Sequence, residues 1–278
     1  MPTILLATDL SPQADRALAR AALLAQSHGE GLAVLHAVGK ELRTDPGLEA
    51  ALAAARDQLG DDLAEAGLPA GVAVTPLART GDAGPAIVEA AKEAGSRMVV
   101  LAAPRADLLV EIFRRSVLHH VVRHAPCPVL VVRRRARQAY RRILVGVDLS
   151  QPSRRALEAA LRLLPGEAMA QVELTVVHAH LAALPPAEVA EQRARVEDML
   201  TAALARLAAE GRQAPASAQA IAEAGTPEAA LTAEAKRRGA ELVVVGTLGL
   251  TGAANLLLGS TAETLLATLP CDVLAVRG

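Results

Sequence analysis

Short apolar runs alternate with longer amphipathic stretches along the second half of the chain. The apolar runs, which we predict to be strands, cover 143–148, 172–178, 218–222, 242–246 and 273–276. Stretches rich in Ala, Leu, Glu and Arg separate them and predict helices near 152–164, 186–210, 227–238 and 260–268. Continuously apolar strands are typical of parallel sheets covered on both faces, and their alternation with helices predicts a doubly wound α/β fold.

The first half of the chain repeats this pattern with related residues. The segment ILLATDLS at 4–11 corresponds to ILVGVDLS at 143–150, an offset of 139 residues. Near the two ends, PCPVLVVR at 126–133 corresponds to PCDVLAVR at 270–277, an offset of 144 residues. The second copy therefore carries about five extra residues, which we assign to the region between His178 and Gly225. Self-similarity over such a distance indicates two copies of one domain.

The boundary between the copies falls near residue 138, after the basic run at 133–138. We therefore predict one domain at 1–138 and a second at 139–278. A run of like charges is usually a solvated linker, and we favour that interpretation over a nucleic-acid-binding patch. Ser11-Pro12 and Ser150-Gln-Pro152 predict helix starts in the two copies, with Ser as the N-cap and Pro in the first turn.

Composition narrows the possible partners. Hydrophobic residues make up 52% of the chain and charged residues 21%, as in soluble globular proteins, and the net charge of -1 gives no general attraction to nucleic acid or to an anionic membrane. With no Trp, one Tyr and one Phe, the chain lacks the aromatic platforms of single-strand nucleic-acid binders. No apolar stretch approaches the roughly 20 residues of a membrane span, and we expect no signal peptide before Ile4. We expect a cytoplasmic protein with no nucleic-acid or membrane partner.

The most informative segment follows the fourth predicted strand of the second copy. Gly246, Gly249, Gly259 and Ser260 have the spacing G-x2-G-x9-G-S. Glycine at a strand end lets the backbone turn tightly and lets a ligand approach closely. Gly259 and Ser260 then open a helix, whose free N–H groups and positive dipole end favour phosphate oxygens. The segment therefore predicts a phosphate-binding loop.

With this motif, the chain resembles the universal stress protein family in its tandem two-domain form, and the resemblance covers both halves. Val147-Asp148, the Gly225-Thr-Pro227 turn and the closing segment at 270–277 support it. The resemblance implies two tandem doubly wound domains, each with a five-stranded parallel sheet of order 3-2-1-4-5 flanked by helices. In that order the first and fourth strands are neighbours where the order reverses, and ligands of open α/β sheets bind at such a point.

The resemblance also implies a ligand and the residues that bind it. ATP, or another adenine nucleotide, would bind in the second domain together with Mg. Asp148 would hold the adenosine end, and the backbone near Ala179 would meet the adenine edge. The complete set of implied binding residues is Gly146, Val147, Asp148, Ala179, Gly246, Gly249, Gly259, Ser260 and Thr261. At Gly146 the chain departs from the family, whose members often have Pro there.

In the first copy the glycine motif has decayed. Ala102, Arg105 and Arg115 replace the three glycines, whereas Asp9 and Ser116 remain. One interpretation is a closed, structural site, because large side chains stand where the backbone should approach the ligand. In the other interpretation, an arginine at 105, 114 or 115 is a charge partner for phosphate in its own site or across the domain interface.

Other candidate residues favour structural roles. His119, His120 and His124 lie near one predicted helix, but they lack the glutamate of HExxH and a third ligand, so we predict no metal site. His36 and His178 occupy matching strand positions and are most simply hydrogen-bonded core histidines. Asp9 and Asp148 precede helices in Asp-x-Ser turns, which predicts a turn role for Asp9. For Asp148, the nearby glycines favour ligand contact.

Cys127 and Cys271 are repeat mates in apolar surroundings, and we predict buried thiols without reactivity. The chain has no Walker A motif, no GxSxG elbow and no general base that we can identify, so we assign no catalytic residue. The leading hypothesis is an ATP-binding regulatory or stress-response protein. The alternatives are a slow ATPase or autophosphorylating phosphotransferase, and a nucleotide-free interaction module that assembles through its edge strands.

The resemblance implies one further contact. Family members pair through their fifth strands, so 129–133 and 273–277 would pair within the chain as an internal pseudo-dimer. A homodimer of the whole chain is compatible with this arrangement, and the protein partner is open.

Overall fold

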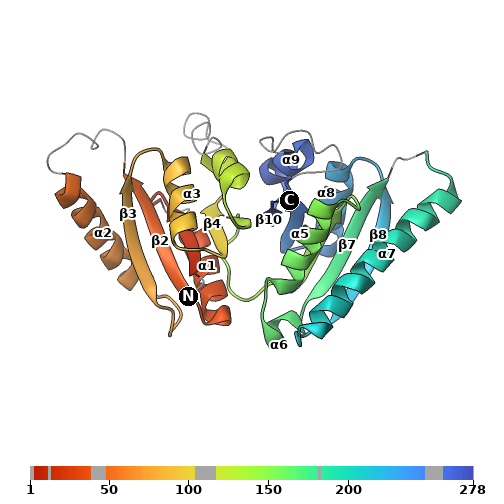
Figure 1. Cartoon of the computed structure of the whole chain (residues 1–278), viewed down its shortest axis with the longest axis horizontal. Helices are drawn as coiled ribbons and strands as arrows, with labels where there is room; N and C mark the ends of the chain where they lie inside the picture. The colour runs from red at the N-terminus through yellow and green to blue at the C-terminus, as the bar shows by residue number, and fades with distance from the viewer. Residues whose placement is uncertain are drawn as a thin grey trace. The chain divides into compact units, whose positions relative to one another are not determined.

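The computed structural model describes residues 3–11, 14–38, 48–103, 117–180, 183–247 and 259–277. The chain divides into two compact units, Met1–Gln138 and Ala139–Gly278. Figure 1 shows strands and helices alternating along each unit.

The N-terminal unit contains a parallel sheet in the order β3-β2-β1-β4-β5. Its strands are β1 (Thr3–Thr8), β2 (Gly31–Val38), β3 (Val74–Thr80), β4 (Met98–Ala102) and β5 (Val129–Val132). Its helices are α1 (Ala14–His28), α2 (Leu48–Glu65) and α3 (Ala83–Glu93), followed by a helical segment over 117–124.

The C-terminal unit repeats this order as β8-β7-β6-β9-β10, again with parallel pairs. Its strands are β6 (Arg142–Val147), β7 (Glu173–His180), β8 (Ser217–Ala224), β9 (Leu242–Gly246) and β10 (Asp272–Val276). Its helices are α5 (Gln151–Arg162), α6 (Gly166–Met169), α7 (Pro186–Ala209), α8 (Pro227–Arg238) and α9 (Ser260–Thr268). Each unit therefore has the order 3-2-1-4-5, and the predicted fold class is confirmed.

Helices cover both faces of each sheet, which explains the unbroken apolar runs. In the C-terminal unit α5 packs on β6 and β9, and α7 packs on β7 and β8. The helix α8 contacts β6 and β7, and α9 contacts β10. Val145, Val176 and Val244 are fully buried in the middle strands. Because side chains on both faces of these strands are covered, a polar residue would lose its hydration on either face.

The strands and helices differ from the expected ones mainly at their ends. Strand β6 ends at Val147, so Asp148 lies just beyond the strand in which we had included it. Strand β8 runs two residues further than expected, to Ala224, although several of its side chains are only partly buried. The short helix α6 was not predicted, since four residues carry too little periodicity to be recognised.

The basic run after β5 is held against α1 in the N-terminal unit. Arg16 Nη1 donates to the Arg133 carbonyl at 2.7 Å, and Arg20 Nη1 donates to the Gln138 carbonyl at 2.9 Å. Arg20 is itself 7% exposed. Hydrogen bonds from guanidinium groups to backbone carbonyls hold this segment against α1.

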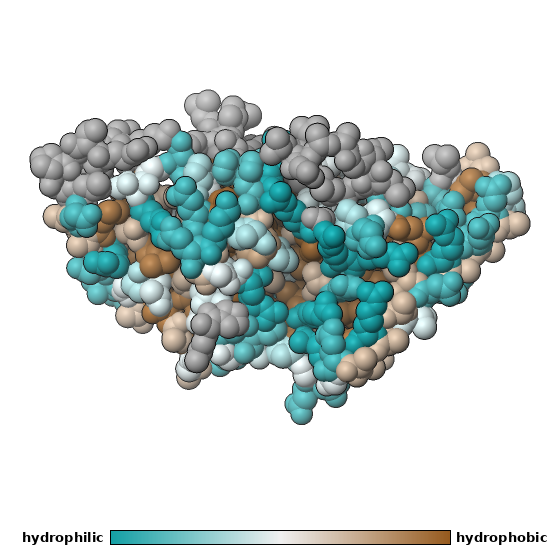
Figure 2. Space-filling model, in the orientation of Figure 1, coloured by the Kyte–Doolittle hydropathy of each residue, from teal (hydrophilic) through white to brown (hydrophobic). Residues whose placement is uncertain are grey.

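The face shown in Figure 2 is mostly hydrophilic, and its hydrophobic residues form separate patches. Among the described residues, Leu10 is the large hydrophobic residue that is exposed, at 43%. Within the same part of the chain, no helix combines the length and the apolar character that a membrane span requires.

Candidate functional site

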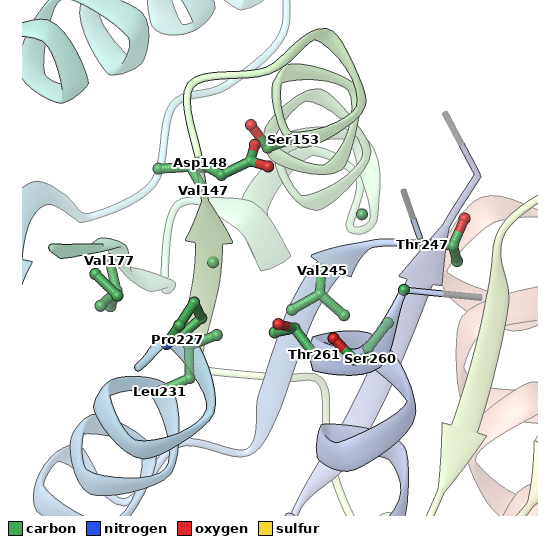
Figure 3. Close-up of a pocket in the computed structure, with 15 residues that line it drawn as sticks. Val147, Asp148, Ser153, Val177, Pro227, Leu231, Val245, Thr247, Ser260 and Thr261 are labelled. Atoms are coloured by element: carbon green, nitrogen blue, oxygen red, sulfur yellow. The ribbon is translucent and has the colours of Figure 1, made fainter. Parts of the chain in front are cut away.

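A cavity opens in the C-terminal unit at the carboxyl ends of β6 and β9, the neighbouring strands at which the order reverses (Figure 3). The structure brings eight of the nine predicted binding residues to this cavity. They are Gly146, Val147, Asp148, Ala179, Gly246, Gly259, Ser260 and Thr261. Gly249, the ninth, lies outside the described residues. The remaining lining residues, which sequence reasoning missed, are Ser153, Val177, Pro227, Leu231, Val245, Thr247 and Ala262.

The turn after β6 orients Asp148. Its Oδ1 accepts a hydrogen bond from the Ser150 backbone N–H at 3.0 Å, and also one from the Ser150 hydroxyl. In Figure 3 the carboxylate points toward the start of α5, where Ser153 lies. Ser150 is the N-cap of α5, as predicted, because its side chain accepts from the Ser153 N–H. Leu149, between the two, has a left-handed φ of 63°, which is uncommon for a residue with a side chain.

The N-terminal unit forms the same turn, with the Ser11 N–H donating to Asp9 Oδ1 at 3.0 Å and Leu10 at φ 59°. The Asp-x-Ser turn is therefore common to both copies and does not by itself distinguish a ligand-binding aspartate. What distinguishes Asp148 among the described residues is that it lines the cavity of the C-terminal unit.

Two matching histidines support these turns. His178 on β7 donates from Nδ1 to the Val147 carbonyl at 2.9 Å, and its Nε2 lies 3.1 Å from the Gln192 side chain on α7. His36 on β2 makes the equivalent bond to the Thr8 carbonyl at 3.1 Å. Both rings are partly buried at strand ends rather than in the core, which refines the prediction of core histidines.

Gly146 is required by the packing of the cavity wall. A Cβ at this position would lie 2.7 Å from Leu231 Cδ1 and 3.3 Å from Val245 Cγ1. Apolar atoms prefer about 3.5–4.0 Å, so any larger residue would have to displace the buried Leu231 side chain. A residue with a Cβ at position 146, Pro included, would meet this leucine on α8.

The junction between β9 and α9 forms the opposite wall. The Gly259 N–H donates to the Thr247 carbonyl at 2.9 Å, and the Thr247 N–H donates to the Val276 carbonyl at 2.9 Å, which ties the start of α9 to the sheet. A Cβ on Gly259 would lie 3.2 Å from the Thr247 carbonyl oxygen. Gly259 is the N-cap of α9, and no side-chain hydrogen bond caps the helix there. First-turn N–H groups lack intrahelical partners, so those at the start of α9 can serve an anion.

The start of α8 adds a carboxylate beside this helix. The Thr261 hydroxyl donates to Glu228 Oε1 at 2.5 Å, which joins the first turns of α9 and α8. This hydrogen bond lowers the pKa of Glu228 below its ordinary value, against a smaller opposing effect of burial. Glu228 is therefore charged at neutral pH. The signal that could have revealed it is its place directly after the Gly225-Thr-Pro227 turn.

The corresponding arginines of the N-terminal unit, Arg105, Arg114 and Arg115, lie outside the described residues, as does Ser116. Ala102, which stands where the second copy has Gly246, ends β4 and is partly buried. The two interpretations of that site therefore remain predictions.

The histidines of the N-terminal unit contact one another. The rings of His120 and His124 stack with centroids 4.3 Å apart, and His124 Nδ1 donates to the His120 carbonyl at 2.7 Å. Burial lowers the pKa of His120, and the nearby His124 lowers it further. Among the described residues, no group of three or more His, Cys, Asp or Glu side chains is arranged to hold a metal ion.

The two cysteines differ in exposure. Cys271 is buried, at 2% exposed, whereas Cys127 is only partly covered. Burial nevertheless raises the pKa of the Cys127 thiol to about 12. A thiol with this pKa is protonated at neutral pH, and the thiolate is the reactive form.

A comparison with models of protein families decides which family the chain belongs to. The model described as "Universal stress protein family" matches residues 1–133 and again 139–277. The chain belongs to the universal stress protein family. The predicted resemblance, in its tandem form, is thereby confirmed. A search of curated proteins gave no significant match.

Solved universal stress proteins match the whole chain or half of it at low sequence identity. A universal stress protein from Archaeoglobus fulgidus DSM 4304 is 20% identical with a TM-score of 0.70, covering 99% of this chain and 96% of that one. A putative universal stress protein from Pseudomonas aeruginosa UCBPP-PA14 is 24% identical with a TM-score of 0.66, covering 100% and 93%. A universal stress protein solved in complex with cAMP is 28% identical over 50% of this chain and 98% of that one, with a TM-score of 0.38.

Proposed function

We propose that this universal stress protein is a regulatory protein that binds an adenine nucleotide in the cavity of its C-terminal unit. The observation that carries the proposal is the convergence of Asp148, Gly246 and the start of α9 on one cavity. Residues far apart in the sequence meet there at the carboxyl edge of the sheet, where α/β folds bind ligands.

The lining supplies an environment for each part of a nucleotide. Val147, Val177, Leu231 and Val245 form an aliphatic wall on which a base can rest. Asp148 is the carboxylate among the described lining residues, and it suits ribose hydroxyls, which are hydrogen-bond donors. Phosphate oxygens would be held by the first-turn N–H groups of α9 and by the hydroxyl of Ser260.

Mg would be carried by the nucleotide rather than by a preformed protein site. Among the described residues no cluster of three or more acidic, His or Cys side chains is available to hold it. Mg²⁺ keeps several waters and is often bound through substrate phosphates, so such a site is not required. The role of the cation would be to neutralise phosphate charge.

The proposal is tested by equilibrium dialysis of ATP, ADP and AMP, with and without Mg, against the wild-type chain and Gly259→Arg. The substitution places a large side chain at the start of α9, as the N-terminal copy has at 115. We expect one nucleotide per chain for the wild type and at least a tenfold loss of affinity for the variant. The control Ala267→Arg adds the same charge on the exposed side of α9 and should bind normally.

Two results would contradict the proposal. Equal affinity of Gly259→Arg and the wild type would exclude this cavity, and two nucleotides per chain would exclude restriction to the C-terminal unit. Phosphate release measured on the same samples separates a binding protein from a slow ATPase. We expect at most slow turnover, because the Asp148 carboxylate is already engaged with Ser150.

A further inference from the structure

A carboxylate lies beside the end of the cavity where we place the phosphates. Glu228 accepts the Thr261 hydroxyl at 2.5 Å, and Thr261 lines the cavity. In Figure 3, Thr261 and Ser260 at the start of α9 lie across the cavity from Pro227 and Leu231 on α8. Glu228 directly follows Pro227, so its charge lies beside the first turns of both helices.

No cationic side chain offsets this charge among the described residues that line the cavity. The described lining residues include no Lys, Arg or His. The intervening segment 248–258, LGLTGAANLLL, contains no charged residue. A nucleoside triphosphate carries about four negative charges at neutral pH, whereas the helix terminus supplies only about half a positive charge.

The Thr261 hydroxyl has a single proton to donate. In the structure this proton goes to Glu228, so a phosphate oxygen at the same place would have to displace the carboxylate as its acceptor. Two anionic acceptors that compete for one donor also repel each other, and this repulsion is stronger near a protein surface than in bulk water.

The pair is specific to the C-terminal unit. By the repeat offset of 144 residues, Gly84 corresponds to Glu228 and Val117 to Thr261. The N-terminal copy therefore has neither the carboxylate nor the hydroxyl. There the imidazole of His120 covers Gly84, and a Cβ on Gly84 would lie 3.0 Å from the ring.

We propose that Glu228 is a specificity-determining residue that disfavours uncompensated phosphate charge, so that the cavity binds a nucleoside triphosphate more tightly as its complex with a divalent cation than without it. This inference rests on the nucleotide binding proposed above. Without the cation, the cavity prefers adenine ligands that carry little phosphate charge.

The test measures the affinities of adenosine, AMP and ATP by titration calorimetry for the wild type and Glu228→Gln, in EDTA and in Mg. The glutamine keeps the length and an acceptor oxygen but removes the charge. We expect ATP affinity in EDTA to rise about tenfold in the variant, which corresponds to about 1.4 kcal/mol, while adenosine affinity stays within twofold. In Mg, the difference between wild type and variant for ATP should shrink to twofold or less.

The matched control is Glu263→Gln, which removes an exposed carboxylate from the first turn of α9. Neither glutamate lines the cavity itself, but Glu228 accepts the hydroxyl of the lining residue Thr261. It should leave the ratio of ATP to adenosine affinity unchanged. Thermal unfolding of each variant verifies that it is folded.

The outcomes separate the two proposals. If adenosine binds but Glu228→Gln leaves the ratio of ATP to adenosine affinity in EDTA unchanged, the proposed role of Glu228 is wrong and the proposed nucleotide binding stands. An equal rise of ATP affinity in Glu263→Gln would also overturn the inference. The effect would then come from the net charge of the region and not from Glu228 itself. If none of the three ligands binds to either protein, both proposals fail.

Discussion

Replacing Gly146 by Ala tests how tightly the wall of the cavity is packed. The new methyl carbon would lie 2.7 Å from Leu231 Cδ1 and 3.2 Å from Cδ2, about 1 Å inside ordinary contact distance. Leu231 is 3% exposed and lines the cavity, so its side chain would relieve this contact by moving into the space where we place the nucleotide. Overpacking of this kind costs about 1–3 kcal/mol, and the lower unfolded-state entropy of Ala offsets about 0.5–1 kcal/mol. We expect a net loss of about 1–2 kcal/mol.

A double-mutant cycle isolates the contact. Leu231→Ala alone should cost about 2–5 kcal/mol, because it leaves a cavity in the packed wall. In the double variant the smaller side chain at position 231 makes room for the methyl carbon that Gly146→Ala adds. The loss in the double variant should therefore be smaller than the sum of the single losses by about 1–3 kcal/mol.

Tyr140 provides the assay. It is the single tyrosine of a chain without tryptophan, so tyrosine fluorescence reports on the C-terminal unit. Its side chain is buried, and its hydroxyl donates to Asp272 Oδ2 at 2.6 Å, an environment that unfolding removes. Urea unfolding of the four proteins is followed by this signal.

The control is Gly60→Ala in α2, where the nearest atom to an added Cβ is Pro76 Cγ at 3.9 Å. This substitution adds the same methyl group without a clash and should cause no loss of stability. Because α2 lies in the N-terminal unit, unfolding of this variant is followed by far-ultraviolet circular dichroism rather than by Tyr140. Additivity of Gly146→Ala and Leu231→Ala within about 0.5 kcal/mol would refute the proposed contact.

Three further predictions concern other parts of the chain. Ser150→Ala removes the N-cap of α5 and should lower the free energy of unfolding by about 1 kcal/mol in the same urea assay. An unchanged free energy of unfolding would contradict the capping role. Burial raises the pKa of Cys127 to about 12, so in the folded chain this thiol should react with iodoacetamide at pH 8 far more slowly than free cysteine does. In urea it should react at the normal rate, and equal rates in the folded and unfolded chains would contradict this prediction. The pKa of His120 is lowered by burial and by His124, with Asp82 opposing, so the unfolded chain binds more protons and stability should fall as the pH drops through about 6.5. His120→Gln should flatten that part of the pH profile of urea unfolding, followed here by circular dichroism because Tyr140 lies in the other unit. An unchanged slope would exclude His120 as its source.

The sequence alone determined the fold and most of the candidate site. Continuous apolar runs predicted buried parallel strands, because such runs are stable only where both faces are covered. The repeat offsets and the glycine spacing identified the segments that line the cavity, since these features lie within short stretches of chain. Ser150 was recognisable as a helix cap for the same reason. That the lining residues bind a nucleotide, and that 129–133 pairs with 273–277, stay predictions.

The tertiary structure decided which side chains complete the cavity. Leu231 stands against Gly146 because α8 packs over β6, and Val245 does so because β9 pairs with β6. Sequence spacing does not specify either contact. Glu228 and Thr261 are 33 residues apart and meet only because the first turns of α8 and α9 lie side by side. Local patterns carry information on backbone conformation and burial, whereas the charge at the phosphate end of the cavity depends on which helices are neighbours. The proposed effect of Glu228 on the binding of phosphate charge could therefore be inferred only from the folded chain.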